Sequence, residues 1–135
     1  MKSLFVDANV FLRFFTTDDK GQHKRAAALF RKAASGEVAL VTGPPVLFEI
    51  AWMLGTAYKQ SHERILDALS AIVALPGLRL TDAGLVEEAL ALARKSGQAF
   101  ADAYIVAGAQ DAGTDEIATF NRRHFEKLDA PLHRF

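Results

Sequence analysis

The sequence predicts an α/β domain built on a mostly parallel sheet of four to five strands, and two observations support this prediction. First, short apolar runs without polar alternation recur along the chain, as expected of strands that are buried on both faces of a sheet. Second, longer stretches with helical periodicity separate these runs, an order that favours parallel pairing through right-handed crossovers. The predicted strands cover residues 4–6, 38–41, 78–80, 117–119 and 132–135.

The first predicted strand ends abruptly at Asp7, and the residues that follow it are typical of a helical turn. Parallel sheets place their functional sites at the carboxyl ends of strands, near a switch in strand order. Asp7 is therefore the first candidate site residue. The alternative is a purely local role, in which its carboxylate caps the following helix.

The later helices carry their own boundary signals. Asp18 and Asp19 precede the second helix as cap candidates, and Asp19 with Gln22 resembles a capping box. A proline pair fits the first turn of a helix, where the missing N–H is harmless, and glycine commonly follows the last turn. The remaining signals are Pro44, Pro45, Ser61, Thr81 and Asp82 at helix starts, and Gly36, Gly97 and Gly113 at helix ends.

Composition limits the classes of function. With 135 residues, half of them hydrophobic, the chain is expected to form one domain over residues 1–135. It has no cysteine, which excludes disulfides, thiol catalysis and sulfur-ligated metals. Its 16 basic and 16 acidic residues give zero formal charge, so nucleic-acid binding would need a local basic patch. The N-terminal apolar run is too short for a signal peptide or a membrane span, which predicts a cytoplasmic protein.

Two further carboxylates lie in strongly apolar helical segments. Glu49 shares a predicted helix face with Val46, Ile50 and Met53, and this face is expected to be buried. Asp102 lies in the first turn of another apolar helix. The alternatives are a distant salt bridge or a rim position for Glu49, and a favourable helix dipole for Asp102. Burial of a carboxylate is costly unless it is protonated, paired or bound to a cation.

Three carboxylates in apolar settings are explained together if folding gathers Asp7, Glu49 and Asp102 around a hard divalent cation. Mg²⁺ and Mn²⁺ prefer oxygen ligands and also bind substrate phosphates. Such an ion lowers the pKa of a bound water and neutralises charge on a leaving oxygen. The sequence therefore predicts metal-dependent hydrolysis of phosphodiester bonds.

Four segments together resemble the PIN-domain family, and more narrowly the VapC-type toxins of toxin–antitoxin pairs. They are FVDANVFLRFF at residues 5–15, the central Glu49, FADAYIVA at residues 100–107 and ATFNRRHF at residues 118–125. The resemblance implies a three-layer α/β/α sandwich and an endoribonuclease that depends on Mg²⁺ or Mn²⁺. It also implies a homodimer and inhibition by a VapB-like antitoxin.

The resemblance assigns roles to individual residues. The metal-binding acids of the family match Asp7, Glu49 and Asp102. Asn121 stands where the family often has a fourth acid; it keeps a carbonyl oxygen without the charge, so a second ion should bind weakly or not at all. Thr119 matches a small hydroxyl residue that supports the site, and Asn9 falls where a polar group orients the first aspartate.

Three arginines could supply the local basic patch, with solvated surface positions as the equal alternative. They are Arg13, Arg122 and Arg123. Two other functions stay open. A phosphatase or phosphotransferase could use Asp7 as its nucleophile, although Asn9 stands where such enzymes need a second aspartate. A catalytically weak PIN-like module could bind protein or RNA without cleaving it, as the neutral Asn121 suggests.

Overall fold

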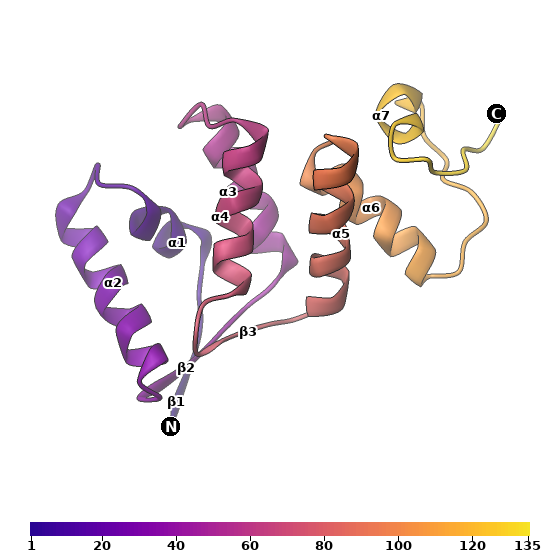
Figure 1. Ribbon diagram of the computed structural model, residues 1–135. Helices are drawn as coiled ribbons and strands as arrows, with labels where there is room; N and C mark the ends of the chain where they lie inside the picture. Colours follow the sequence, from indigo (N-terminus) through magenta and orange to yellow (C-terminus); the bar gives the residue numbers. More distant parts are fainter. The chain divides into compact units, whose positions relative to one another are not determined.

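The computed structural model describes residues 1–135, and the chain forms two compact units, Met1–Ala83 and Gly84–Phe135. In Figure 1 the first unit runs from indigo to pink and contains the sheet, while the second is drawn in orange and yellow. The three candidate acids are divided between them. Asp7 and Glu49 belong to the first unit, and Asp102 belongs to the second.

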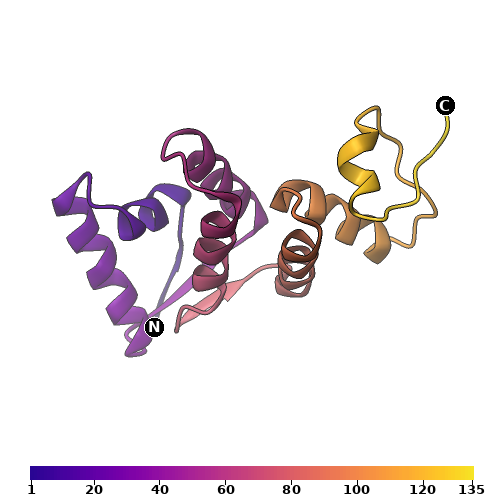
Figure 2. The ribbon, with the colours of Figure 1, turned by 45° about the horizontal axis from the view of Figure 1, so that its top comes forward.

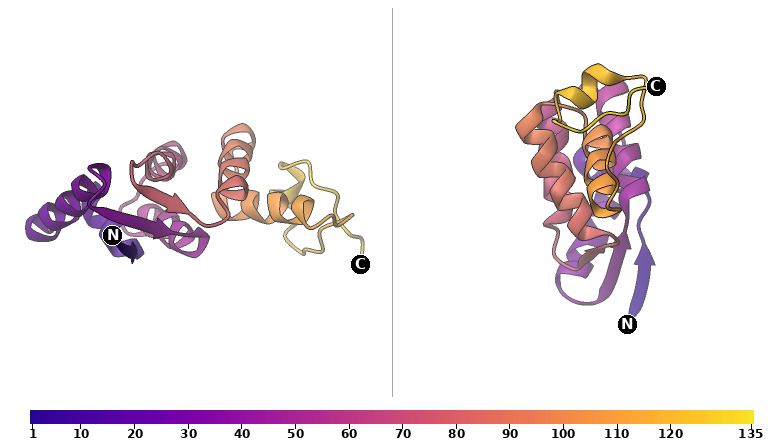
Figure 3. Two further views of the ribbon diagram at one scale, coloured as in Figure 1. Left: turned by 90° about the horizontal axis from the view of Figure 1, so that it is seen from below. Right: turned by 90° about the vertical axis from the view of Figure 1, so that its right-hand side faces the viewer.

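A parallel sheet of three strands, in the order β1-β2-β3, organises the first unit. The strands are β1 (Lys2–Phe5), β2 (Val38–Thr42) and β3 (Leu78–Leu80). Figure 3 shows β1 and β2 side by side in its right-hand view, with Lys2 opposite Val38 at the start of the pairing. Because the strands run in the same direction, their carboxyl ends meet at one edge of the sheet, and Asp7 lies just beyond β1 at that edge.

Four helices accompany the sheet of the first unit. They are α1 (Ala8–Phe15), α2 (Lys20–Ala34), α3 (Pro44–Thr56) and α4 (His62–Val73). Helix α2 contacts β2 and α4 contacts β3, while α1 contacts both α2 and α3. Phe11, Leu47 and Leu69 are fully buried between these elements. The apolar stripes of the helices therefore build the core that holds the strand ends.

Several predicted helix boundaries are confirmed. The Asp19 carboxylate accepts a hydrogen bond from the N–H of Gln22 at 2.9 Å, and Ser61 Oγ accepts one from the N–H of Arg64 at 3.2 Å. Helix α3 begins with its proline pair. The glycines with positive φ at helix ends include Gly36 at 82°, Gly97 at 73° and Gly113 at 72°. These boundaries depend on neighbouring residues only, which is why the sequence reveals them.

Helices form most of the second unit, as Figure 2 shows. They are α5 (Ala83–Ser96), which starts at the boundary between the units, α6 (Phe100–Asp111) and α7 (Arg122–Glu126). Val86, Phe100 and Val106 are among its buried side chains, and α6 contacts α7. No helix in either unit combines the length and the apolar character that a membrane crossing requires.

The prediction of four to five strands is wrong, because the sheet has three. Residues 117–119 and 132–135 make only one parallel bridge, between Ile117 and Leu132. Two hydrogen bonds form it, from Ile117 N–H to the Pro131 carbonyl at 2.8 Å and from His133 N–H to the Ile117 carbonyl at 2.9 Å. Pro131 has no N–H to extend the ladder in one direction. In the other direction the His133 carbonyl accepts a hydrogen bond from Arg122 Nη1 at 3.1 Å.

The buried hydroxyl of Thr42 is expected to stabilise the strand ends. Thr42 is fully buried, and its Oγ1 donates to the carbonyl of Val6 at 2.9 Å. A Thr42→Val variant keeps the shape but removes this donor, so its free energy of unfolding should fall by about 1–3 kcal/mol in a urea titration. The exposed Thr114, which donates to the Ala109 carbonyl at 2.9 Å, provides the control. Thr114→Val should change stability by less than about 0.5 kcal/mol, and an equal loss in both variants would contradict this role for burial.

Candidate active site

Asp7 lies in the turn that leads from β1 into α1. It is the N-cap of α1, and its Oδ1 accepts a hydrogen bond from the N–H of Ala8 at 2.8 Å. The local role that the sequence offered as an alternative is therefore real. The side chain is nevertheless exposed, and the capping bond occupies only one of its two carboxylate oxygens. Capping and cation binding are compatible for this residue.

The bond that holds Asp7 comes from the backbone of Ala8 and not from Asn9. Asn9 is exposed and lines a groove of about 310 Å³ between α1 and α2. The other residues of this groove are Val10, Arg13, Gln22, Arg25, Ala26 and Leu29. The predicted role of Asn9 was to orient Asp7, and the hydrogen bond that orients Asp7 here comes from Ala8.

Glu49 lies on the exposed face of α3, whereas the sequence predicted a buried face. The buried residues of this helix are Pro44, Val46, Leu47, Ile50 and Leu54. Glu49 falls between Pro45 and Trp52 on the opposite stripe, where Trp52 is 66% exposed. Helix α3 is apolar on nearly every side, so periodicity alone did not identify which face would be covered. Packing within the first unit therefore leaves the Glu49 carboxylate exposed and gives it no desolvation cost.

Within the second unit, Asp102 lies in the first turn of α6 and its side chain is 23% exposed. The predicted position near the positive end of the helix dipole is confirmed. Asp102 Oδ2 lies 3.4 Å from His124 Nδ1, which projects from α7. His124 Nδ1 also lies 2.9 Å from Asn121 Nδ2. Three polar side chains from α6 and the start of α7 therefore meet in this unit.

Thr119 and Asn121 are held together by the turn that precedes α7. The N–H of Asn121 donates to Thr119 Oγ1 at 2.9 Å, and the Asn121 side chain makes no capping bond to the helix. The amide of Asn121 is thereby left to contact His124. The hydroxyl at position 119 fixes the backbone from which Asn121 projects.

His124 is the residue of this cluster that sequence reasoning left without a role. One ring nitrogen, Nδ1, faces both the Asp102 carboxylate and the Asn121 amide. As a donor, Nδ1–H can bond to the carboxylate or to the amide oxygen, and as an acceptor it can bond only to the amide N–H. The signal in the sequence is the spacing of three residues from Asn121, which places the two side chains on one side of a helical turn.

Neither unit by itself gathers three or more His, Asp or Glu side chains into a group that could hold a metal ion. The first unit contributes Asp7 and Glu49, both exposed, and the second contributes Asp102 beside His124. All of the candidate donors are oxygen or imidazole groups. A set of this kind suits Mg²⁺ or Mn²⁺ and gives no thiolate for softer metals.

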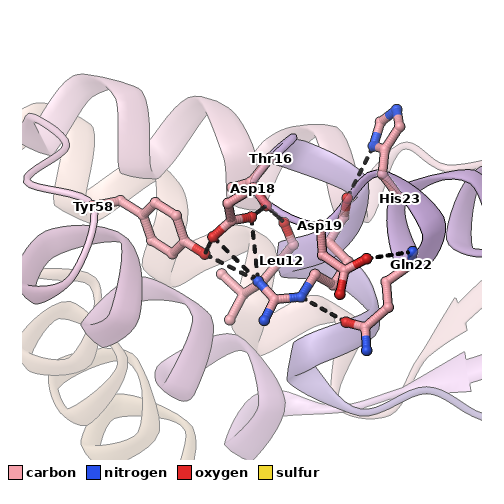
Figure 4. Close-up of polar contacts among 8 residues, drawn as sticks. Leu12, Thr16, Asp18, Asp19, Gln22, His23 and Tyr58 are labelled. Carbon is pink, nitrogen blue, oxygen red and sulfur yellow. Dashed lines mark hydrogen bonds and ion pairs between the residues drawn. The ribbon is translucent and has the colours of Figure 1, made fainter.

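Arg13 takes part in a polar cluster of the first unit, part of which Figure 4 shows around Asp18 and Tyr58. Its Nε donates to Gln22 Oε1 at 2.7 Å, and its Nη1 lies 3.3 Å from Asp18 Oδ1 and from the Tyr58 hydroxyl. The Tyr58 hydroxyl donates to Asp18 Oδ2 at 2.9 Å. Arg13 therefore has a structural role that ties α1 to α2 and to the segment after α3, and phosphate contact would have to compete with it.

Asp18 should make the stability of the protein depend on acid pH. Hydrogen bonds from Thr16 and Tyr58, with the nearby Arg13 guanidinium, lower the pKa of the Asp18 carboxyl below its ordinary value of 3.8. Because the folded state holds the lower pKa, this stabilisation is complete above the ordinary value and is lost as pH falls through the folded value. The Tm difference between wild type and Asp18→Asn should therefore be larger at about pH 6 than at about pH 3. A constant difference across this range would show that the charge of Asp18 contributes nothing.

The other two arginines lie on α7 in the second unit. Arg122 donates to the His133 carbonyl at 3.1 Å and lies 3.8 Å from Glu126 Oε1, yet its side chain remains 45% exposed. Arg123 is exposed. Both remain accessible to an anionic partner.

The order of these elements and residues agrees with one protein family. A family model described as PIN domain matches residues 4–131, which includes every candidate site residue. The chain belongs to the PIN-domain family. PIN domains have an α/β fold, and they are generally nucleases that act on RNA or DNA, typically with divalent metals. A comparison with curated proteins finds no match.

Proposed function

We propose that this PIN domain is an endoribonuclease that requires Mg²⁺ or Mn²⁺ and acts as the toxin of a toxin–antitoxin pair. The observation that carries the proposal is the family match over residues 4–131, which spans all three candidate acids. The proposed partners are an RNA substrate, a VapB-like antitoxin and a second copy of the chain in a homodimer. The proposed location is the cytoplasm.

The proposal requires Asp7, Glu49 and Asp102 to bind one cation. Because the family match runs through both units, we propose that residues 1–135 act as one domain with the three-layer α/β/α architecture. Asp7, Glu49 and Asp102 would then be the ligands of a single ion. Their carboxylate oxygens are of the kind that Mg²⁺ and Mn²⁺ prefer.

Different residues would have different roles in phosphodiester cleavage. The bound ion would activate a water and neutralise charge on the leaving oxygen. Asp7, whose Oδ1 accepts the bond from Ala8, would offer its second carboxylate oxygen to the ion. His124 and Asn121 would limit the orientations that the Asp102 carboxylate can adopt. Arg122 and Arg123 are available to bind RNA phosphates beside this cluster.

Asn121 bears on the number of ions. A neutral amide offers one carbonyl oxygen and no charge, and here its amide group already contacts His124. A second divalent ion would therefore lack a carboxylate at this position. We propose a site with one strongly bound ion.

The direct test is cleavage of a labelled RNA by purified protein freed of antitoxin. Cleavage should appear on addition of Mg²⁺ or Mn²⁺ and disappear with a chelator, and Ca²⁺ should support it poorly because its larger coordination shell is less suited to activating a water here. Internal cuts in a circular RNA would distinguish an endonuclease from an exonuclease. Absence of cleavage with every metal, in protein that still binds Mn²⁺, would contradict the proposal.

A binding module without catalysis is the second candidate, because Asn121 lacks the charge of a fourth acid. Such a module should show no thermal stabilisation by Mn²⁺, whereas a cluster of carboxylates gains stability when it binds a cation. The phosphatase alternative has less support, since Asn9 stands at the position of its second aspartate and the family match favours a nuclease.

A further inference from the structure

The second unit carries two strongly exposed aromatic rings that lie against each other. Phe120 is 88% exposed and Phe135 is 74% exposed. Their ring centroids are 4.5 Å apart with an interplanar angle of 22°, so the rings are stacked. His133 adds an edge contact to Phe135 at 5.1 Å. Stacking covers one face of each ring, and the exposed fractions show that most of both rings remains accessible.

Basic side chains surround the stacked rings. Phe120, Phe135, Thr119, Arg122 and Arg134 line one cavity of about 470 Å³. Arg134 is exposed. From residue 119 to residue 135 there are four Lys or Arg and two Asp or Glu residues, a formal charge of +2 in a chain whose total is zero. Positive charge is therefore concentrated beside the rings.

Flat rings with neighbouring guanidinium groups fit one kind of ligand well. Every nucleobase has a π-face that can stack on an aromatic side chain, and the phosphate next to it can bind an arginine. A base can offer its face only when it is unpaired, since bases inside a duplex are stacked on each other. The charge favours an anionic ligand, and the flat rings favour an unpaired base, so the two together fit single-stranded nucleic acid.

We propose that Phe120, Phe135 and Arg134 form a binding site for an unpaired base and its phosphate in single-stranded RNA. This site, which we call the aromatic platform, deepens the proposed function because it names the form of substrate that the enzyme takes. Phe120 lies between Thr119 and Asn121, whose backbone and side chain lead to His124 and Asp102. A base on Phe120 would hold the strand next to this cluster.

The test is fluorescence anisotropy with a labelled single-stranded oligoadenylate and a labelled RNA hairpin, in buffer with chelator so that no cleavage occurs. The single strand should bind more tightly than the hairpin stem. Phe120→Leu and Phe135→Leu remove the flat ring but keep an apolar side chain, and each should weaken single-strand binding about tenfold. Phe120→Trp should bind as tightly as the wild type or more tightly. The logarithm of the RNA association constant falls linearly with the logarithm of the salt concentration. Arg134→Gln should make this slope less steep by about 0.7.

Phe15 provides the matched control. It is an exposed aromatic ring of the first unit and lies beside Arg64 in a groove of that unit. Phe15→Leu should leave RNA binding unchanged. The proposal is overturned if Phe120→Leu binds RNA as tightly as the wild type, or if Phe15→Leu weakens binding equally. It is also overturned if the Phe120 and Phe135 variants lose thermal stability without losing affinity, because the rings would then pack within the protein or against a second copy.

The platform and the nuclease can fail separately. RNA binding that depends on Phe120, with no cleavage under any metal condition, would leave the platform and remove the proposed function. Metal-dependent cleavage, together with unchanged RNA affinity in Phe120→Leu, would support the proposed function and overturn the aromatic platform.

Discussion

An Asp102→Asn variant should cleave RNA at least about a hundredfold more slowly than the wild-type chain. The change keeps the size of the side chain and one carbonyl oxygen, but it removes the charge that holds the proposed cation. A bound ion contributes several kcal/mol to transition-state stabilisation, and about 1.4 kcal/mol corresponds to a tenfold change in rate. Initial rates with a labelled RNA at fixed Mn²⁺ concentration measure the loss.

Asp111→Asn is the matched control for this variant. Asp111 is the last residue of the same helix, α6, and it is exposed. Its substitution should leave the rate unchanged. Without metal, Asp102→Asn should lose no more than about 1 kcal/mol of stability, because it gives up only the favourable helix-dipole interaction and the contact with His124. A rate loss that circular dichroism traces to unfolding, or an equal loss in Asp111→Asn, would contradict the role of Asp102.

The Gly77→Ala variant should lose about 2–5 kcal/mol of unfolding free energy. Gly77 has a φ of 79°, a conformation that costs a residue with a Cβ about 1–2 kcal/mol. A Cβ at this position would also lie 2.3 Å from the Ala33 carbonyl oxygen, which is backbone and cannot rotate away. The backbone shift that this overlap forces should lower the unfolding free energy by about a further 1–3 kcal/mol. The midpoint and slope of a urea titration give the change.

Gly36 separates the two contributions. Its φ of 82° is as unfavourable as that of Gly77, but a Cβ there would meet nothing within 4 Å. Gly36→Ala should therefore cost only about 1–2 kcal/mol. If both variants lost the same free energy, the close approach of β3 and the end of α2 at Gly77 would not contribute to stability.

Features set by neighbouring residues were predictable from the sequence. The cap at Asp19, the cap at Ser61 and the positive φ of Gly97 each depend on a few adjacent positions, and all three are confirmed. The pairing of the first three strands also follows from short apolar runs separated by helices. Local chemistry and hydrophobic pattern agree in this part of the chain.

Features set by distant residues were not predictable in the same way. Residues 117–119 have the apolar character of a strand, but a proline and a side-chain donor from Arg122 limit their pairing to one bridge. Glu49 was assigned to the wrong face because every side of α3 carries apolar residues. The sequence predicts Asp18 as a cap of the second helix, but its carboxylate accepts a hydrogen bond from Tyr58 instead. The two residues are 40 positions apart, so no local pattern indicates this contact.

Residue type identified the candidate site residues in the sequence, and the structure added the local contacts of Asp7 and Asp102. Carboxylates after β1 and within α6 were visible as unusual residues in apolar segments. The contact of Asp102 with His124 depends on how α7 packs on α6, which no short motif encodes. The exposed pair of Phe120 and Phe135 likewise appears only once the C-terminal segment folds back to residue 117.

The most direct test of the proposed metal site is a calorimetric titration with Mn²⁺. It compares the wild-type chain with Asp7→Asn, Asp102→Asn and the double variant, and asks whether Asp7 and Asp102 bind the same ion. Asn is as good a helix cap as Asp, so the Asp7 variant should remain folded. If Asp7 and Asp102 bind the same ion, each single variant should lose most of the Mn²⁺ affinity. The double variant should then lose little more. Unchanged affinity in Asp102→Asn, or losses that simply add in the double variant, would show that the two carboxylates do not bind the same ion.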